Sequence, residues 1–145
     1  MASAQGPRPC QRAQLRAGET VLVVGAGGGV NSLSILLAKA AGANVIALSS
    51  ADKIDKAARL GASAVINYTQ QPEWGAEVLK LTKGRGVDVV IGARSAVFAR
   101  VPNLCAIVVI DEHDDSLQEE RTPTWHARDV AIMRAKQQQI SCVLC

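Results

Sequence analysis

The sequence predicts an α/β protein with a Rossmann-like, doubly wound parallel sheet of about six strands in three α/β/α layers. Short apolar runs alternate with segments of helical periodicity, which is the pattern of successive βαβ units. Hydrophobic residues make up 48% of the chain and aromatic residues only 3%. The core must therefore consist of Val, Ile, Leu and Ala, which suits a parallel sheet buried under helices.

Apolar runs bounded by polar residues and glycines predict the strands. These runs cover residues 20–24, 44–48, 64–66, 87–91, 106–110 and 140–144. Taken in this order they can wind as 3-2-1-4-5-6, the order of a complete doubly wound sheet.

Periodicity and terminal signals predict the helices between the strands. The first helix ends at Gly42, and its apolar positions are Val30, Leu33, Leu36, Leu37 and Ala40. The second is capped by Ser49 or Ser50, ends at Gly61 and places Ile54, Ala57 and Ala58 on one face.

The third helix has Pro72 in its first turn and ends at Lys83-Gly84. Its apolar residues are Trp74, Val78 and Leu81. Further along, the sequence predicts a short helix at 95–99, an acidic, turn-like segment at 111–124 and a helix at 125–138.

The domain organisation follows from these elements. We expect residues 1–17 to form a flexible leader, because they combine Pro, Gly and polar residues without a period. Residues 18–145 then form a single Rossmann-like domain. This domain has a join at Val90-Ile91-Gly92, with one half at 18–91 and the other at 92–145.

Bulk properties exclude some classes of protein. The net charge is +3, with +4 in residues 1–91 and −1 in residues 92–145. This excess is too small and scattered to indicate nucleic-acid binding.

No apolar run approaches the roughly 18–20 residues that span a bilayer. The N-terminus has no secretory apolar region. The four cysteines show no disulfide framework, which predicts a cytoplasmic protein.

The segment Gly25-Ala26-Gly27-Gly28-Gly29-Val30-Asn31 links the first strand to the first helix. Glycines let a backbone turn tightly and approach a pyrophosphate, and the helix N-terminus offers free N–H groups. The loop departs from G-x-G-x-x-G, because Val30 stands in place of the third glycine. We predict a dinucleotide site here; the alternative is a tight strand–helix turn without a ligand.

Residues 16–91 resemble the cofactor domain of medium-chain dehydrogenases/reductases, in the branch of zinc-type alcohol dehydrogenases and quinone oxidoreductases. The resemblance implies NADP or NAD as cofactor. The matching stretches are Gly18–Val23, Gly25–Val30, Leu37–Ala43, Leu60–Ala62, Val65–Tyr68 and Gly84–Asp88.

The ribose end of the site separates the two cofactors. An NAD site usually has an acid at the end of the second strand, whereas this chain has Ser49-Ser50 there. In the NADPH-using quinone reductases that this stretch resembles, positions matching Ser50, Lys53 and Tyr68 surround the 2′-phosphate. The resemblance therefore favours NADP(H). The alternatives are Ser50 as a helix cap, Lys53 as a solvated side chain and Tyr68 as a half-buried strand end.

Complete alcohol dehydrogenase chemistry is not expected. The family's catalytic domain precedes the cofactor domain, and only 17 residues precede Gly18, with one cysteine and no histidine. A catalytic zinc needs three protein ligands, and the sequence shows no such set.

A second set of stretches follows the join: Gly92–Ala99, Pro102–Leu104, Ile107–Asp114 and His126–Val130. On these stretches, residues 92–145 resemble a segment of the actinobacterial primosomal replication-restart helicase (primosomal protein N-prime). The resemblance implies that Asp111 holds Mg²⁺ and Glu112 orients the attacking water. A phosphate loop of type G-x-x-x-x-G-K-[ST] is absent, so ATP hydrolysis is not expected. The alternative for the six acids in residues 111–120 is a solvated loop.

Three functional hypotheses result. The first is binding of NADP(H) or NAD(H) at the glycine loop, with nicotinamide hydride transfer as the reaction if the protein is an enzyme. The second is ATP or Mg²⁺-nucleotide binding through Asp111 and Glu112. The third is a recombined or engineered folded domain without native catalysis. Apolar surface left by an incomplete sheet predicts a homodimer.

Overall fold

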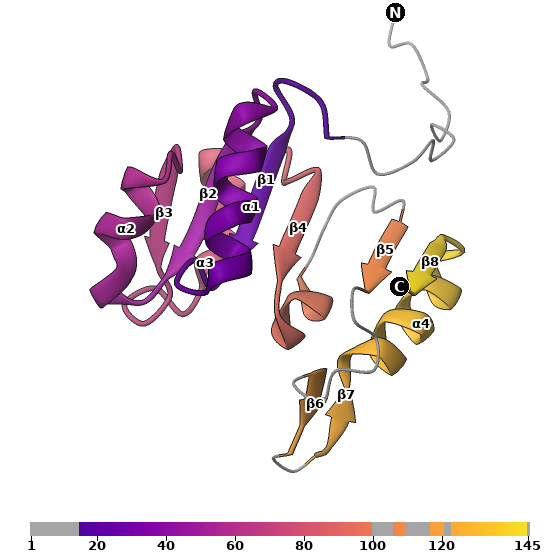
Figure 1. Ribbon diagram of the computed structural model, residues 1–145. Coiled ribbons are helices and arrows are strands. Elements are labelled where there is room, and N and C mark those ends of the chain that lie inside the picture. Colours follow the sequence, from indigo (N-terminus) through magenta and orange to yellow (C-terminus); the bar gives the residue numbers. More distant parts are fainter. Residues whose placement is uncertain (1–14, 100–105, 110–116, 121–122, 145) are drawn as a thin grey trace, which may run out of the picture.

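A parallel four-stranded sheet forms the centre of the N-terminal part of the protein (Figure 1). The computed structural model describes residues 15–99, 106–109, 117–120 and 123–144. Within these ranges the first sheet has the order β3-β2-β1-β4. Its strands are β1 (Thr20–Val24), β2 (Asn44–Ser49), β3 (Ala64–Asn67) and β4 (Val89–Gly92). The predicted order 3-2-1-4 is confirmed for these four strands.

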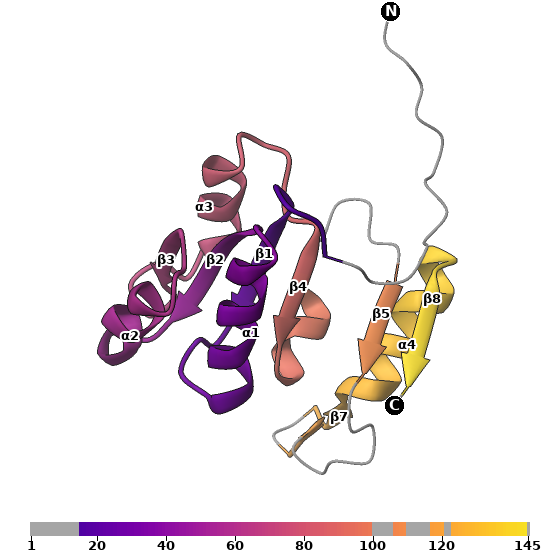
Figure 2. The ribbon, with the colours of Figure 1, turned by 45° about the horizontal axis from the view of Figure 1, so that its top comes forward.

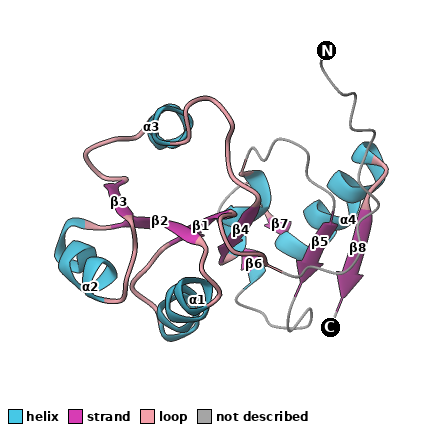
Figure 3. Cartoon of the chain, turned by 90° about the horizontal axis from the view of Figure 1, so that it is seen from above, coloured by secondary structure: helices cyan, strands magenta, loops and turns pink. Residues whose placement is uncertain are grey.

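Helices cover both faces of this sheet, as Figure 3 shows. The helices α1 (Gly29–Ala40) and α2 (Ile54–Arg59) lie on one face, and α3 (Trp74–Leu81) lies on the other. Val21 and Val23 of β1 pack in the cluster with α1 and α2, whereas Leu22 packs with Val78 of α3. This alternation follows from the period of two in a strand. It confirms the three-layer α/β/α arrangement.

The helix α1 buries a different face from the one that its leucines indicate. The residues Ile35 and Ala38 are buried. The exposed apolar residues of the helix are Val30 at 77%, Leu33 at 55%, Leu36 at 47% and Leu37 at 61% of their surface. Apolar residues surround most of this helix, so periodicity alone cannot select the face that meets the sheet. The small Ala38 lets the helix approach the strands closely. In α2 and α3, the predicted inward residues Ala58 and Leu81 are likewise exposed.

The starts of β1 and β4 are joined by a polar clamp. The backbone N–H of Thr20 donates to Asp88 Oδ2 at 2.7 Å, and the N–H of Asp88 donates to the Thr20 carbonyl at 2.9 Å. Arg85 donates from Nη1 to Asp88 Oδ1 and from Nη2 to Thr20 Oγ1, both at 2.8 Å. The ladder of β4 begins at Val89, two residues later than the sequence predicts, since Asp88 takes part in the clamp.

The six predicted strands do not form one sheet. The strands β5 (Ala106–Val109) and β8 (Ser141–Leu144) form a separate parallel pair with Val108 opposite Val143. Across the described ranges, no strand ladder joins β4 to β5, although Figure 2 shows β5 as the next strand beyond β4. The order of the strands therefore fits the prediction, but the sheet is interrupted.

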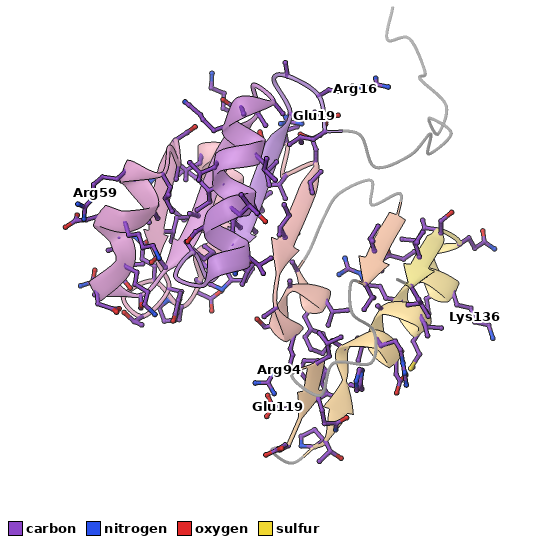
Figure 4. All side chains as sticks on the ribbon, in the orientation of Figure 1. Arg16, Glu19, Arg59, Arg94, Glu119 and Lys136 are labelled. Carbon is purple, nitrogen blue, oxygen red and sulfur yellow. The ribbon has the colours of Figure 1, made fainter. Side chains whose placement is uncertain are left out.

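Contacts through a short 3-10 helix, η2 (Arg94–Phe98), connect the C-terminal elements to the rest of the chain. Arg134 of the helix α4 (Ala127–Gln138) donates to the Val97 carbonyl at 2.6 Å. The rings of Phe98 and Trp125 meet edge to face at 4.8 Å. The charged groups of Arg94 and Glu119 lie 3.8 Å apart. Figure 4 labels these two residues next to each other.

Part of the segment expected to be turn-like is paired. The strands β6 (Gln118–Glu119) and β7 (Trp125–His126) form a short antiparallel ladder. This pairing makes α4 start at Ala127 instead of residue 125. His126 caps the helix, because its Nδ1 accepts a hydrogen bond from the Arg128 N–H at 3.2 Å.

The end of the expected leader packs on the domain. Leu15 lies against the cluster beneath α1, and the N–H of Gly18 donates to the Gly42 carbonyl at 2.9 Å. Residues 15–17 are therefore held by the core and by this turn, whereas residues 1–14 lie outside the described residues. Every helix in the part of the chain that the structure describes is too short or too polar to span a bilayer.

Candidate functional site

The glycine loop folds back over the end of β2. The N–H groups of Gly25 and Ala26 donate to the Leu48 carbonyl at 3.0 and 2.9 Å, and the N–H of Gly27 donates to the Gly25 carbonyl at 2.8 Å. Gly25 has a φ of +85°, a conformation that favours glycine. Ala26 is fully buried and anchors the loop in the core. The sequence thus forms a tight, fixed turn at the carboxyl end of β1.

The mouth of this turn is open at the start of α1. A Cβ added at Gly28 or Gly29 would meet nothing within 4 Å. Gly28 is the N-cap and has no side chain to satisfy the first N–H groups of the helix. Free N–H groups and the positive end of the helix dipole make this position suitable for an anion. Val30 follows in the first turn with most of its side chain exposed.

Asn31 stabilises the loop through two hydrogen bonds from its side chain to the backbone. Its amide Nδ2 donates to the Val24 carbonyl at 3.0 Å and to the Gly25 carbonyl at 2.8 Å. Both donor hydrogens are therefore used by the turn. Asn31 therefore fixes the shape of the loop, a role that the sequence pattern alone could not distinguish from direct contact with a ligand.

A small pocket of roughly 100 Å³ lies beside the loop, at the carboxyl ends of β1 and β2. This volume is below the range of about 300–1,000 Å³ for whole ligands, so it suits one part of a ligand, such as a ribose or a phosphate. Gly29, Val30 and Asn31 are not in its lining. The lining consists of Gly25, Ala26, Gly27, Gly28, Ser49, Ser50, Lys53 and Tyr68, all of which the sequence predicts as cofactor-binding residues.

Two lysines reach the loop at Gly27. The side chain of Lys53 lies so close that a Cβ on Gly27 would be 2.2 Å from its Cδ and 3.0 Å from its Nζ. Lys56 Nζ donates to the Gly27 carbonyl at 3.4 Å. Lys56 is not among the site residues predicted from the sequence. Its spacing of three from Lys53 was the available signal, since residues three apart share a helix face.

The ends of β2 and β3 form the opposite rim of the pocket. Ser49 is buried, its hydroxyl donates to the Ser50 carbonyl at 3.1 Å, and its own carbonyl accepts from the Tyr68 N–H at 3.2 Å. The side chain of Tyr68 is about half exposed at the end of β3. Neither serine provides the predicted side-chain cap for the following helix.

Ser50 instead pairs with an acid on the short 3-10 helix η1 (Ala51–Lys53). Its hydroxyl donates to Asp52 Oδ1 at 2.5 Å. This hydrogen bond lowers the pKa of the Asp52 carboxyl below its ordinary value, with a smaller contribution from the neighbouring Lys53 charge. Asp52 is therefore ionised at neutral pH. Asp52 is not among the site residues predicted from the sequence.

A zinc site does not fit the described residues. Within 15–99, 106–109, 117–120 and 123–144, no three His, Cys, Asp or Glu side chains lie close enough together to hold a metal ion. The predicted Mg²⁺ ligands Asp111 and Glu112 lie outside these ranges.

The strand order and the glycine loop define a Rossmann-like domain of the NAD(P)-binding type found in medium-chain dehydrogenases. In the sheet, β2 and β4 lie on opposite sides of β1, so the strand order reverses its direction at β1. The glycine loop follows β1 and therefore lies at this switch point. The chain belongs to the zinc-binding dehydrogenase family. The family model matches residues 29–107, which are more than half of this chain.

Individual relatives agree with this family. A zinc-type alcohol dehydrogenase-like protein of Schizosaccharomyces pombe is 46% identical over 79 residues, which are 54% of this chain and 22% of that protein. The crystal structure of an NAD-dependent alcohol dehydrogenase aligns with 90% of this chain and 36% of its own, at a TM-score of 0.64 and 29% identity. The chain thus spans less than half the length of these relatives.

A second resemblance is also present. The replication restart protein PriA of Bacillus subtilis is 45% identical over 58 residues, which are 40% of this chain and 7% of that protein. The chain therefore combines sequence similar to two different families. The dehydrogenase-family match extends beyond the join at Gly92 as far as residue 107.

Proposed function

We propose that this chain binds a dinucleotide, NADP(H) in preference to NAD(H), at the loop Gly25–Asn31. The observation that supports this proposal most is the pocket beside Gly27, which is lined by the segment Gly25–Gly28 and by Lys53, with open space at Gly28. A pyrophosphate fits the start of α1, where the glycines leave space and helix N–H groups are free. Lys53 and Lys56 supply positive charge at the same place.

The preference for NADP(H) rests on the rim of the pocket. Ser50 and Tyr68 supply hydroxyl groups and Lys53 an ammonium group, and no carboxylate belongs to the pocket lining. A 2′-phosphate on the adenosine ribose would therefore meet the Tyr68 hydroxyl and the positive charge of Lys53 at the wall itself.

The proposed chemistry is that of the bound cofactor. A nicotinamide supplies or accepts a hydride when bound. The residues of this chain contribute binding and orientation: the loop fixes the pyrophosphate, and Ser50, Lys53 and Tyr68 hold the adenosine ribose. We further propose that the chain has residual oxidoreductase activity with this cofactor.

Calorimetric titration with NADPH, NADH and ATP tests this function. We expect micromolar binding of NADPH, and a loss of at least about tenfold in Gly27→Asp, because a carboxylate there repels phosphate and displaces Lys53. Gly75→Asp is the matched control, since a Cβ at Gly75 on α3 meets nothing within 4 Å. Binding of ATP alone, or of no nucleotide at millimolar concentration, would contradict the proposal.

We also propose that the protein forms a homodimer along β8. This strand lies at the edge of its pair, with Val143 46% and Leu144 39% exposed. Val108 of β5, opposite Val143, is similarly exposed. Apolar residues on an edge strand favour pairing with another chain.

A cytoplasmic location is proposed with these functions. The support is that Cys142 is a free thiol within the part of the chain that the structure describes, as is typical of proteins in a reducing compartment. Burial raises the pKa of this thiol, which keeps it protonated and less reactive at neutral pH.

A further inference from the structure

An acid lies one hydrogen bond away from the wall of the proposed cofactor pocket. Ser50 is a lining residue, whereas Asp52 is not, and the two are joined by the 2.5 Å bond from Ser50 Oγ to Asp52 Oδ1. Asp52 itself is on the solvent side of this bond, with an exposed side chain. The pocket is therefore influenced by a negative charge that its lining does not contain.

The serine has one hydroxyl hydrogen, and this limits what it can bind. While that hydrogen is donated to Asp52, Ser50 offers a phosphate no donor, only its oxygen lone pairs. A ribose 2′-hydroxyl, by contrast, can donate to the oxygen of Ser50. The same bond thus opposes an anion at the rim and favours a neutral hydroxyl.

We propose that Asp52 is a positioning residue that sets the balance between NADP(H) and NAD(H) by holding the Ser50 hydroxyl. A 2′-phosphate must compete with the Asp52 carboxylate for the serine, whereas the hydroxyl of NAD(H) need not. Lys53 acts in the opposite sense, because its ammonium group favours the phosphate. Asp52 therefore moderates the NADP(H) preference proposed above, and the inference rests on that proposed function.

A purely structural role for Asp52 makes a different prediction. Acids in the first turn of a helix interact favourably with its dipole, and Asp52 occupies the first turn of η1. Asp55 occupies the first turn of α2, carries the same charge and is also exposed. A structural or general electrostatic role would make the two acids equivalent with respect to the cofactor.

The experiment compares Asp52→Asn, Asp52→Glu and the matched control Asp55→Asn in the full chain. Calorimetric dissociation constants for NADPH and NADH are measured at low and high salt. We expect Asp52→Asn to shift the affinity ratio toward NADPH by about fivefold, because a neutral amide oxygen accepts the Ser50 hydrogen more weakly than a carboxylate and leaves it freer for a phosphate. Asp52→Glu and Asp55→Asn should change the ratio less than about twofold, and salt should reduce the Asp52→Asn effect through screening.

A double-mutant cycle with Ser50→Ala shows whether the effect passes through the serine. In the Ser50→Ala background, Asp52→Asn should leave the ratio nearly unchanged. An unchanged ratio in Asp52→Asn, or an equal shift in Asp55→Asn, overturns the inference while NADPH binding itself stands. Absence of binding of either dinucleotide to the wild-type chain overturns both the inference and the proposed function.

Discussion

Gly92 ends β4 at the join between the two resemblances, and the packing around it requires a residue without a side chain. A Cβ on Gly92 would lie 2.8 Å from the Val24 Cβ, 2.9 Å from the Ala96 Cβ and 3.1 Å from the Val24 carbonyl oxygen. These neighbours are backbone and short side-chain atoms, so they cannot swing aside. In Gly92→Ala, β1, β4 and η2 must therefore move apart.

The expected cost follows from two opposing contributions. Overpacking of this kind lowers the free energy of unfolding by about 1–3 kcal/mol. The loss of glycine flexibility in the unfolded chain raises it by about 0.4–1 kcal/mol. The net destabilisation is then about 1–2 kcal/mol. With an unfolding entropy of about 2.1 cal/mol/K per residue, a chain of 145 residues should melt about 3–6 °C lower.

Thermal unfolding followed by circular dichroism measures this change. Gly75→Ala is the matched control, because its Cβ meets open space in the helix α3 and a Gly-to-Ala change inside a helix stabilises by about 0.5–1 kcal/mol. The two variants should therefore move Tm in opposite directions. A melting temperature of Gly92→Ala equal to or above that of the wild type would refute the packing at the join.

Three further predictions concern stability, binding and association. Asp88→Ala should destabilise the protein by about 1–3 kcal/mol in urea unfolding, because the buried Thr20 N–H loses its acceptor; an unchanged midpoint would show that the clamp is dispensable. Asn31→Ala should weaken NADPH binding about fivefold in calorimetry by releasing the loop carbonyls, at a cost of about 1 kcal/mol in stability, and full affinity would rule out the bracing role. Val143→Lys should convert a dimer to a monomer in light scattering, since lysine on an edge strand disfavours pairing; a persistent dimer would place the interface elsewhere.

The strands and their order could be predicted because the signals are local. Each apolar run ends at a glycine or polar residue, and successive βαβ units leave few ways to order parallel strands. The glycine loop was predictable for the same reason, since the residues Gly25–Gly28 follow a strand directly and open a helix.

The parts that escaped prediction depend on tertiary contacts. The buried face of α1 was not decided by periodicity, because Ile35 and Ala38 compete with an apolar stripe that includes Leu33 and Leu37. The break between β4 and β5 depends on where η2 packs, which no short pattern encodes. Asp52 was missed because its effect on the site arises from one side-chain hydrogen bond to Ser50.

The join does not interrupt the sheet to which β4 belongs. Val89–Gly92 pair in register with Val21–Val24, so the residues on either side of the join lie within one parallel ladder. The glycine loop directly follows β1, whereas the β5–β8 pair lies after η2 in the chain. The described chain therefore retains the glycine loop at which we propose that a dinucleotide binds.

Backbone amide NMR during a titration with NADPH shows whether the dinucleotide binds at the glycine loop. If NADPH binds there, we expect the largest shift changes on Gly25–Asn31 and on Ser50, Lys53 and Tyr68, and little change in α3 and α4. Shift changes centred on α4 or on the β5–β8 pair, or no changes at millimolar NADPH, would contradict it.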